Sequence, residues 1–105
     1  MFNNSFLKKL NILFIESNTE DREHFSNILY KFFNNVVVCS NGKDGIDNFL
    51  EKRQEYFLDI IICDKTLEDI TGIEVLKKIR EIDSEIPFII TSPKIEVDDL
   101  LIAIK

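Results

Sequence analysis

Two kinds of segment alternate along this chain. Short runs that are apolar throughout and rich in β-branched residues are typical of strands buried on both faces of a sheet. Four such runs occur, at Leu10–Ile15, Val36–Cys39, Asp59–Cys63 and Ile86–Thr91. Between and after them, apolar residues recur at intervals of three and four, which predicts helices with one apolar face.

Each predicted helix is defined by its own apolar stripe. The stripes are Phe25, Ile28, Leu29, Phe32 and Phe33; then Ile46, Phe49 and Leu50; then Ile73, Leu76, Ile79 and Ile82; and last Val97, Leu100, Leu101 and Ile104. Thr71 caps the third helix, and Glu74 completes a capping box. Ser17 fits the same role before the first helix, with Glu20 as its partner.

The alternation of strands and helices predicts an α/β fold with a doubly wound parallel sheet, covered by helices on both faces. A chain of 105 residues with 45% hydrophobic content is long enough for one domain with a real core. We therefore expect a single globular unit without internal repeats.

Composition narrows the functional classes. The net charge is −6 and the 13 basic residues are scattered, so we expect no direct binding to nucleic acid. Cys39 and Cys63 each end an apolar run, a pattern typical of buried free thiols in a reducing compartment. No segment has the pattern of a signal peptide or the length of a membrane span, so we expect a cytoplasmic protein with no membrane contact.

Polar side chains gather where the predicted strands end. Glu16 and Ser17 follow the first strand, Asp64 closes the third, and Thr91 and Ser92 close the fourth. Because the carboxyl ends of parallel strands meet at one edge of the sheet, these residues are expected to converge on one small polar site. Asp64 is the strongest functional candidate, since an apolar strand delivers it there.

With these features the chain resembles the receiver domain of two-component response regulators. The resemblance covers nearly all of residues 9–105, and it rests on three segments: Ile-Leu-Phe-Ile-Glu16-Ser17-Asn18, the run from Asp59 through Asp64 to Gly72, and Ile86-Pro-Phe-Ile-Ile-Thr-Ser92. It implies a flavodoxin-like fold. Residues 1–8 then form an N-terminal extension, and 9–105 form the receiver domain.

The resemblance also implies a role for each site residue. Asp64 would accept a phosphoryl group from a sensor histidine kinase or a phosphotransfer protein. Glu16, Asp64 and the backbone carbonyl of Thr66 would hold Mg²⁺ together with water. Ser92 would contact the phosphoryl group and switch a surface that partners bind, so the domain would be a switch and not a turnover enzyme.

The chain departs from the family pattern at several positions. Ser17 replaces a metal-binding Asp, so it would reach the ion only through water, and we expect Mg²⁺ to bind weakly. Glu68 replaces the Pro that is usual in the loop after the phosphoacceptor. The chain ends at Lys105, before the fifth strand and helix and before the Lys that pairs with the phosphoryl group. We therefore expect either a longer protein with an output domain or a covering partner, such as a second copy in a homodimer.

Alternative hypotheses stay open at this point. Ser17 could only cap a helix, Glu16 could be a solvated loop acid, and Ser92 could be a turn residue before Pro93. A degenerate receiver would serve as a docking or dimerisation module that needs no phosphorylation. The tripeptide Asp64-Lys-Thr also resembles the start of the phosphorylated loop in cation-pumping ATPases and haloacid-dehalogenase-fold phosphatases, without the Gly-Thr that follows there.

Overall fold

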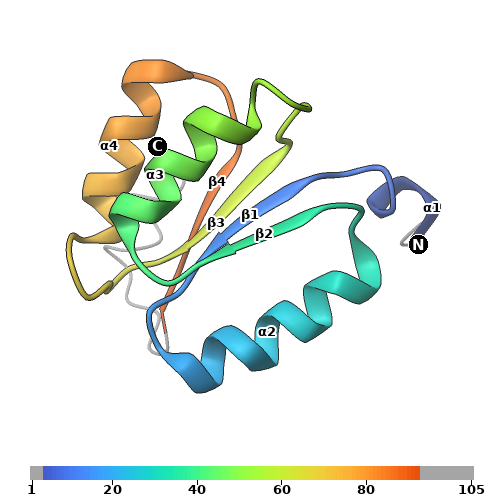
Figure 1. The fold of residues 1–105 in the computed structure, drawn as a ribbon, viewed down its shortest axis with the longest axis horizontal. Coiled ribbons are helices and arrows are strands. Elements are labelled where there is room, and N and C mark those ends of the chain that lie inside the picture. The colour runs from blue at the N-terminus through green and yellow to red at the C-terminus, as the bar shows by residue number, and fades with distance from the viewer. Residues whose placement is uncertain (1–3, 93–105) are drawn as a thin grey trace.

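The computed structural model of the protein describes residues 4–92. Its elements are α1 (Asn4–Leu7), β1 (Ile12–Ile15), α2 (Thr19–Phe32), β2 (Val36–Cys39), α3 (Gly42–Lys52), β3 (Ile60–Asp64), α4 (Gly72–Ile82) and β4 (Phe88–Thr91) (Figure 1). The predicted alternation of strands and helices is confirmed over this range. The single turn α1 falls in the segment predicted as an extension, and the last predicted helix lies outside the described residues.

The strands form one parallel sheet in the order β2-β1-β3-β4. This arrangement confirms the predicted doubly wound α/β fold. From β1 the chain moves to β2 on one side and then returns to β3 on the other, so the order reverses between β1 and β3. Clefts at the carboxyl ends of the strands that flank such a reversal are the usual ligand sites of open α/β sheets.

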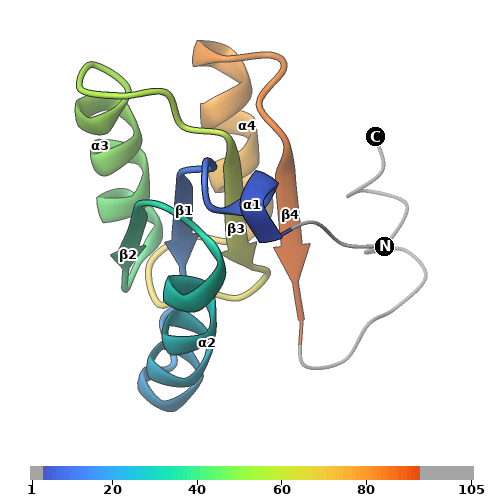
Figure 2. The same ribbon diagram turned by 90° about the vertical axis from the view of Figure 1, so that its right-hand side faces the viewer.

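The two faces of the sheet are covered differently (Figures 1 and 2). Helices α3 and α4 lie on one face, and α2 lies on the other. The face under α3 and α4 contains the main core, a cluster of twelve buried residues: Leu13, Ile15, Cys39, Phe49, Leu58, Ile61, Cys63, Leu67, Val75, Ile79, Ile86 and Phe88. Both cysteines are buried and free, as predicted.

The helix starts test the predicted caps. The Thr71 hydroxyl accepts the Glu74 amide, and the Glu74 carboxylate accepts the Thr71 amide, so the predicted capping box is confirmed. The prediction that Ser17 caps α2 is wrong. Asn18 is the cap, because its side-chain oxygen accepts the Asp21 amide at 2.9 Å.

The apolar stripe of α2 is less covered than its periodicity predicts. Phe25 is 47% exposed, and Ile28 and Phe32 are each 38% exposed. Within residues 4–92, α2 is the main cover of its face of the sheet, whereas α3 and α4 lie on the other face. The stripe therefore borders a partly open apolar surface.

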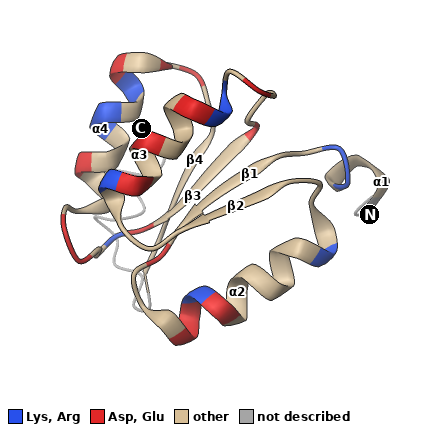
Figure 3. Cartoon of the chain, viewed as in Figure 1, with Lys and Arg blue, Asp and Glu red and all other residues tan. Residues whose placement is uncertain are grey.

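Charged residues lie on the helices and loops, while the strands are uncharged up to their carboxyl ends (Figure 3). Lys and Arg are spread over several elements of the drawn chain. Among residues 4–92, no helix combines the length and the apolar character needed to cross a bilayer.

Candidate functional site

Two buried carboxylates lie side by side where the strand order reverses. Asp64 is the last residue of β3, and Glu16 directly follows β1. The register pairs Ile15 with Cys63, so Glu16 and Asp64 come at the same level of neighbouring strands. They are 5% and 9% exposed. The predicted convergence of these two residues is therefore found in the structure.

Burial beside Asp64 makes it unfavourable for Glu16 to carry its negative charge. The pKa of Glu16 is raised from 4.5 to about 7, chiefly by burial and also by the neighbouring Asp64 carboxyl, through a shared hydrogen bond and through charge repulsion. The Asn18 amide donates to the Glu16 carboxylate at 3.1 Å and opposes the shift. A cation between the two carboxylates would remove this repulsion, so the donor set fits a hard divalent ion such as Mg²⁺.

The loop after Asp64 is closed by backbone contacts. The Gly72 amide donates to the Lys65 carbonyl at 2.8 Å, and Thr66 bridges to Thr71 across the loop. A side chain at Gly72 would collide with the Asp64 backbone carbonyl, so only glycine allows this close approach. This close approach explains why a glycine stands eight residues after Asp64. Thr66 lies in the loop between these two residues.

Ser17 makes contacts that its sequence position did not predict. Its hydroxyl donates to the Ser40 carbonyl at 2.6 Å and accepts the Glu68 amide at 3.0 Å. The Arg22 guanidinium donates to the carbonyls of Glu16 and Ser17, each at 3.1 Å. The segment that carries Glu16 is therefore fixed by a helix residue on one side and by two loops on the other.

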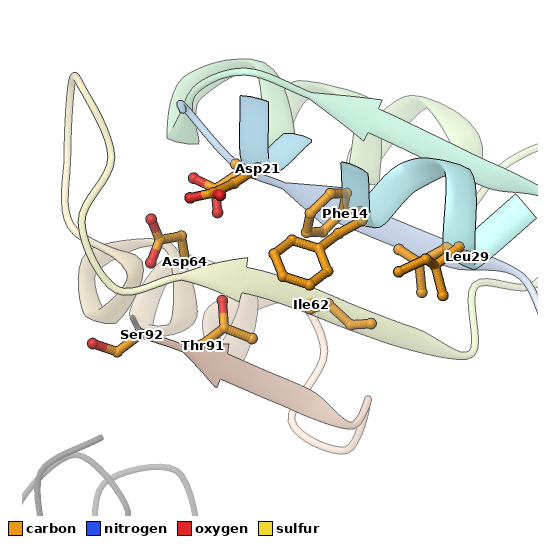
Figure 4. A pocket seen from close by; sticks show the side chains of 10 residues that line it. Phe14, Asp21, Leu29, Ile62, Asp64, Thr91 and Ser92 are labelled. Atoms are coloured by element: carbon orange, nitrogen blue, oxygen red, sulfur yellow. The ribbon is translucent and has the colours of Figure 1, made fainter. Parts of the chain in front are cut away.

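A pocket of about 450 Å³ opens beside the carboxylates (Figure 4). Its lining consists of Phe14, Glu16, Asp21, Phe25, Ile28, Leu29, Ile62, Asp64, Thr91 and Ser92. The acidic residues lie at one end, and the apolar side chains of β1, β3 and α2 extend to the other. Ser92 lies at this pocket, where the sequence predicted it.

Two further lining residues, Asp21 and Thr91, bring oxygen atoms to the pocket. Asp21 lies in the first turn of α2, and its charge contributes to the raised pKa of Glu16. Thr91 is the register partner of Asp64, and its hydroxyl is directed toward the pocket. Even with Asp21 nearby, residues 4–92 contain no cluster of three acidic, His or Cys side chains arranged to hold a metal. Glu16 and Asp64 would therefore supply two carboxylates, and the remaining ligands of a cation would have to be backbone or water oxygens.

Two known proteins with similar sequences have names that describe regulation or sensory transduction. The chain is 33% identical over 70 residues to the transcriptional regulatory protein ZraR of Klebsiella oxytoca, covering 67% of this chain and 15% of that protein. It is 35% identical over 72 residues to the sensory transduction protein LytT of Oceanobacillus iheyensis, covering 69% of this chain and 28% of that protein. The chain thus spans less than a third of either relative.

Structural similarity agrees with the fold. A crystal structure of the CheX-CheY-BeF3-Mg complex of Borrelia burgdorferi matches with a TM-score of 0.81 at 18% identity, over 98% of this chain and 76% of that chain. The family model described as the response regulator receiver domain matches residues 12–105. That match covers most of the sequence, including every residue of the carboxylate pair and its loop, and the chain belongs to the receiver domain family of response regulators.

Proposed function

We propose that this domain, whose family serves two-component signalling, accepts a phosphoryl group on Asp64 in the presence of Mg²⁺. The observation that carries the proposal is the buried pair of Glu16 and Asp64 at the reversal of the strand order. A phosphoryl transfer site needs a nucleophile in a fixed position and charge compensation for the phosphoryl oxygens. Asp64, delivered by a strand and flanked by the pocket, meets the first need.

Each site residue would have its own role in the phosphoryl transfer. Glu16, Asp64 and the Thr66 carbonyl would hold Mg²⁺, which would neutralise charge on the phosphoryl oxygens. A carboxylate oxygen of Asp64 would form the bond to phosphorus while the bond from phosphorus to the donor nitrogen or oxygen breaks. The Ser92 hydroxyl would donate a hydrogen bond to the transferred group. With Ser17 engaged elsewhere, the site would bind Mg²⁺ weakly.

Partners follow from this chemistry. The phosphodonor would be a sensor histidine kinase or a phosphotransfer protein, as is general for receiver domains. The output would be a change in a protein-binding surface, either toward an output domain of a longer protein or toward a second copy in a homodimer. In this role the domain is a switch, and it would not turn over a substrate.

One observation favours a second candidate, a receiver that docks without phosphorylation. The Ser17 hydroxyl points to Ser40 and Glu68, and residues 4–92 hold no three-ligand metal cluster. A phosphatase of the haloacid-dehalogenase type has no such support, since Asp64 ends β3, the third strand along the chain.

Incubation with acetyl phosphate and Mg²⁺, followed by intact mass spectrometry, separates the two candidates. The proposal expects addition of one phosphoryl group, dependent on Mg²⁺ and abolished in Asp64→Asn. Asp64→Asn keeps the size of the side chain and removes a buried negative charge, so it should fold. A wild-type chain that stays unmodified at saturating donor would favour the docking module instead.

A further inference from the structure

Ser17 and Glu68, two positions at which the sequence departs from the receiver pattern, meet in space. The Glu68 backbone amide donates to the Ser17 hydroxyl at 3.0 Å, across 51 positions of sequence. The same hydroxyl donates to the Ser40 carbonyl at 2.6 Å. One side chain therefore joins the segment after β1, the segment after β2 and the loop after β3.

The loop at residues 65–71 is held at a second point nearby. The Asp69 carboxylate accepts the amides of Gly42 and Lys43, both at 2.8 Å, at the start of α3. Burial alone would raise the pKa of Asp69, but these amide contacts lower it overall, so the group stays ionised and bound at neutral pH. The loop is thus tied through Ser17 on one side and through Asp69 on the other.

We propose that Ser17 is a positioning residue whose hydroxyl fixes loop 65–71 relative to Glu16 and Asp64 before a cation binds. The inference rests on the proposed function, because the part of the loop that matters is Thr66, whose carbonyl would complete the cation site. At position 17 this chain carries a neutral hydroxyl that fixes the loop, in place of the metal-binding carboxylate of the family pattern. A loop that is already fixed loses less conformational freedom when it binds a ligand.

The chemistry of the contact explains why these two residue types occur together. A hydroxyl both donates and accepts, so it can serve the Ser40 carbonyl and the Glu68 amide at once. A carboxylate at position 17 could accept the amide but would face the carbonyl without a proton. A proline at position 68 has no amide proton to donate. The contact therefore requires a hydroxyl at 17 and a residue other than proline at 68.

The test is a double-substitution cycle on the full chain, with Ser17→Ala, Glu68→Pro and the two combined. Two matched controls are available. Glu68→Ala keeps the amide and removes only the side chain, and Ser26→Ala deletes another buried hydroxyl, which donates to Glu23 within α2. The readouts are the Mg²⁺ dissociation constant from NMR titration, amide exchange at Glu68, and the thermal midpoint.

We expect each single substitution to weaken Mg²⁺ binding about tenfold, the usual effect of removing a residue that orients metal ligands. The combined variant should be no weaker than either single one, because both break the same contact. The controls should bind Mg²⁺ as the wild type does. Ser17→Ala should also speed exchange of the Glu68 amide by about tenfold, since the amide loses its partner.

The outcomes separate this inference from the proposed function. Unchanged exchange at Glu68 in Ser17→Ala, or effects on Mg²⁺ binding that add in the combined variant, would overturn the positioning role. A loss of thermal stability with unchanged Mg²⁺ affinity would do the same, because it would show a purely structural contact. If the wild type binds no Mg²⁺, the proposed function fails, and the exchange of the Glu68 amide still decides whether Ser17 holds the loop.

Discussion

The two faces of the sheet differ in how completely they are closed. Under α3 and α4, side chains such as Phe49 and Ile79 are 1% and 0% exposed and belong to one continuous cluster. Under α2, Phe14 is buried on the sheet, but Phe25 across from it is 47% exposed and the pocket lies between the helix and β3.

The closed face therefore supports the stability of the fold, whereas the open face gives access to the carboxylates. The closed face fixes β1 and β3 so that Glu16 and Asp64 must share one edge of the sheet. The open face leaves the carboxylates reachable through the pocket, and it leaves apolar surface next to them for a partner or a further segment to cover. The predictions below probe each side of this contrast.

The largest effect is expected from truncating the closed face. Phe49→Ala should lower the free energy of unfolding by about 3–5 kcal/mol, because it leaves a cavity in a packed core. The matched change on the open face, Phe25→Ala, should cost about 0.5 kcal/mol or less, as is usual for exposed positions. Urea denaturation measures both, and equal losses would contradict the contrast between the faces.

Gly72 lies where the closed face meets the site. Gly72→Ala places a methyl group against the Asp64 carbonyl, so the loop must shift. We expect a loss of about 1–3 kcal/mol in stability, typical of overpacking, together with weaker Mg²⁺ binding. Thermal unfolding and Mg²⁺ titration of the same sample test this, with Gly72→Ser as a second, larger substitution. Normal Mg²⁺ binding in Gly72→Ala would show that the loop tolerates the shift.

The pH dependence of stability reports on the carboxylates. With its pKa raised from 4.5 to about 7, Glu16 holds a proton in the folded state that it releases on unfolding. Stability without Mg²⁺ should therefore fall as pH rises between these two values, by up to about 1.4 kcal/mol per pH unit within the window.

Glu16→Gln is the control for that slope, because it keeps the shape and cannot titrate. The difference in unfolding free energy between wild type and Glu16→Gln should grow from pH 5 to pH 7. Asp69 and Asp83 have lowered pKa values, so they act below this window. A difference that stays constant with pH would show that the pKa of Glu16 is not raised in the folded state.

The smallest structural effect should come from the two hydroxyls at the carboxyl end of β4, Thr91 in the strand and Ser92 directly after it. Ser92→Ala and Thr91→Val both line the pocket and should change stability by about 0.5 kcal/mol or less. Ser92→Ala should lower the yield of phosphorylated chain, while Thr91→Val should retain it. The opposite result would assign the phosphoryl contact to Thr91, the register partner of Asp64.

Local patterns predicted much of this architecture. The β-branched runs placed all four strands within two residues of their observed starts and one of their ends, because burial on both faces leaves a strong signal. The parallel topology then brought Glu16 and Asp64 together. The capping box at Thr71 was also predictable, since it depends only on residues three positions apart.

Contacts between distant segments were not predictable in this way. Ser17 was assigned to a helix cap, a local role, but it contacts Ser40 and Glu68 from other loops. The exposure of Phe25 has a similar cause, since the helical period shows which residues share a face and not what covers that face.

The most direct test of the central claim is the response of the Asp64 region to beryllofluoride, a mimic of the phosphoryl group, in the presence of Mg²⁺. Backbone NMR of the wild type should show saturable shifts at Asp64, Thr66 and Ser92 that need both Mg²⁺ and beryllofluoride. Asp64→Asn, which removes the nucleophilic carboxylate, should show none of these shifts. The same adduct in Asp64→Asn, or no adduct in the wild type at saturating Mg²⁺, would contradict the assignment of Asp64 as the phosphoacceptor.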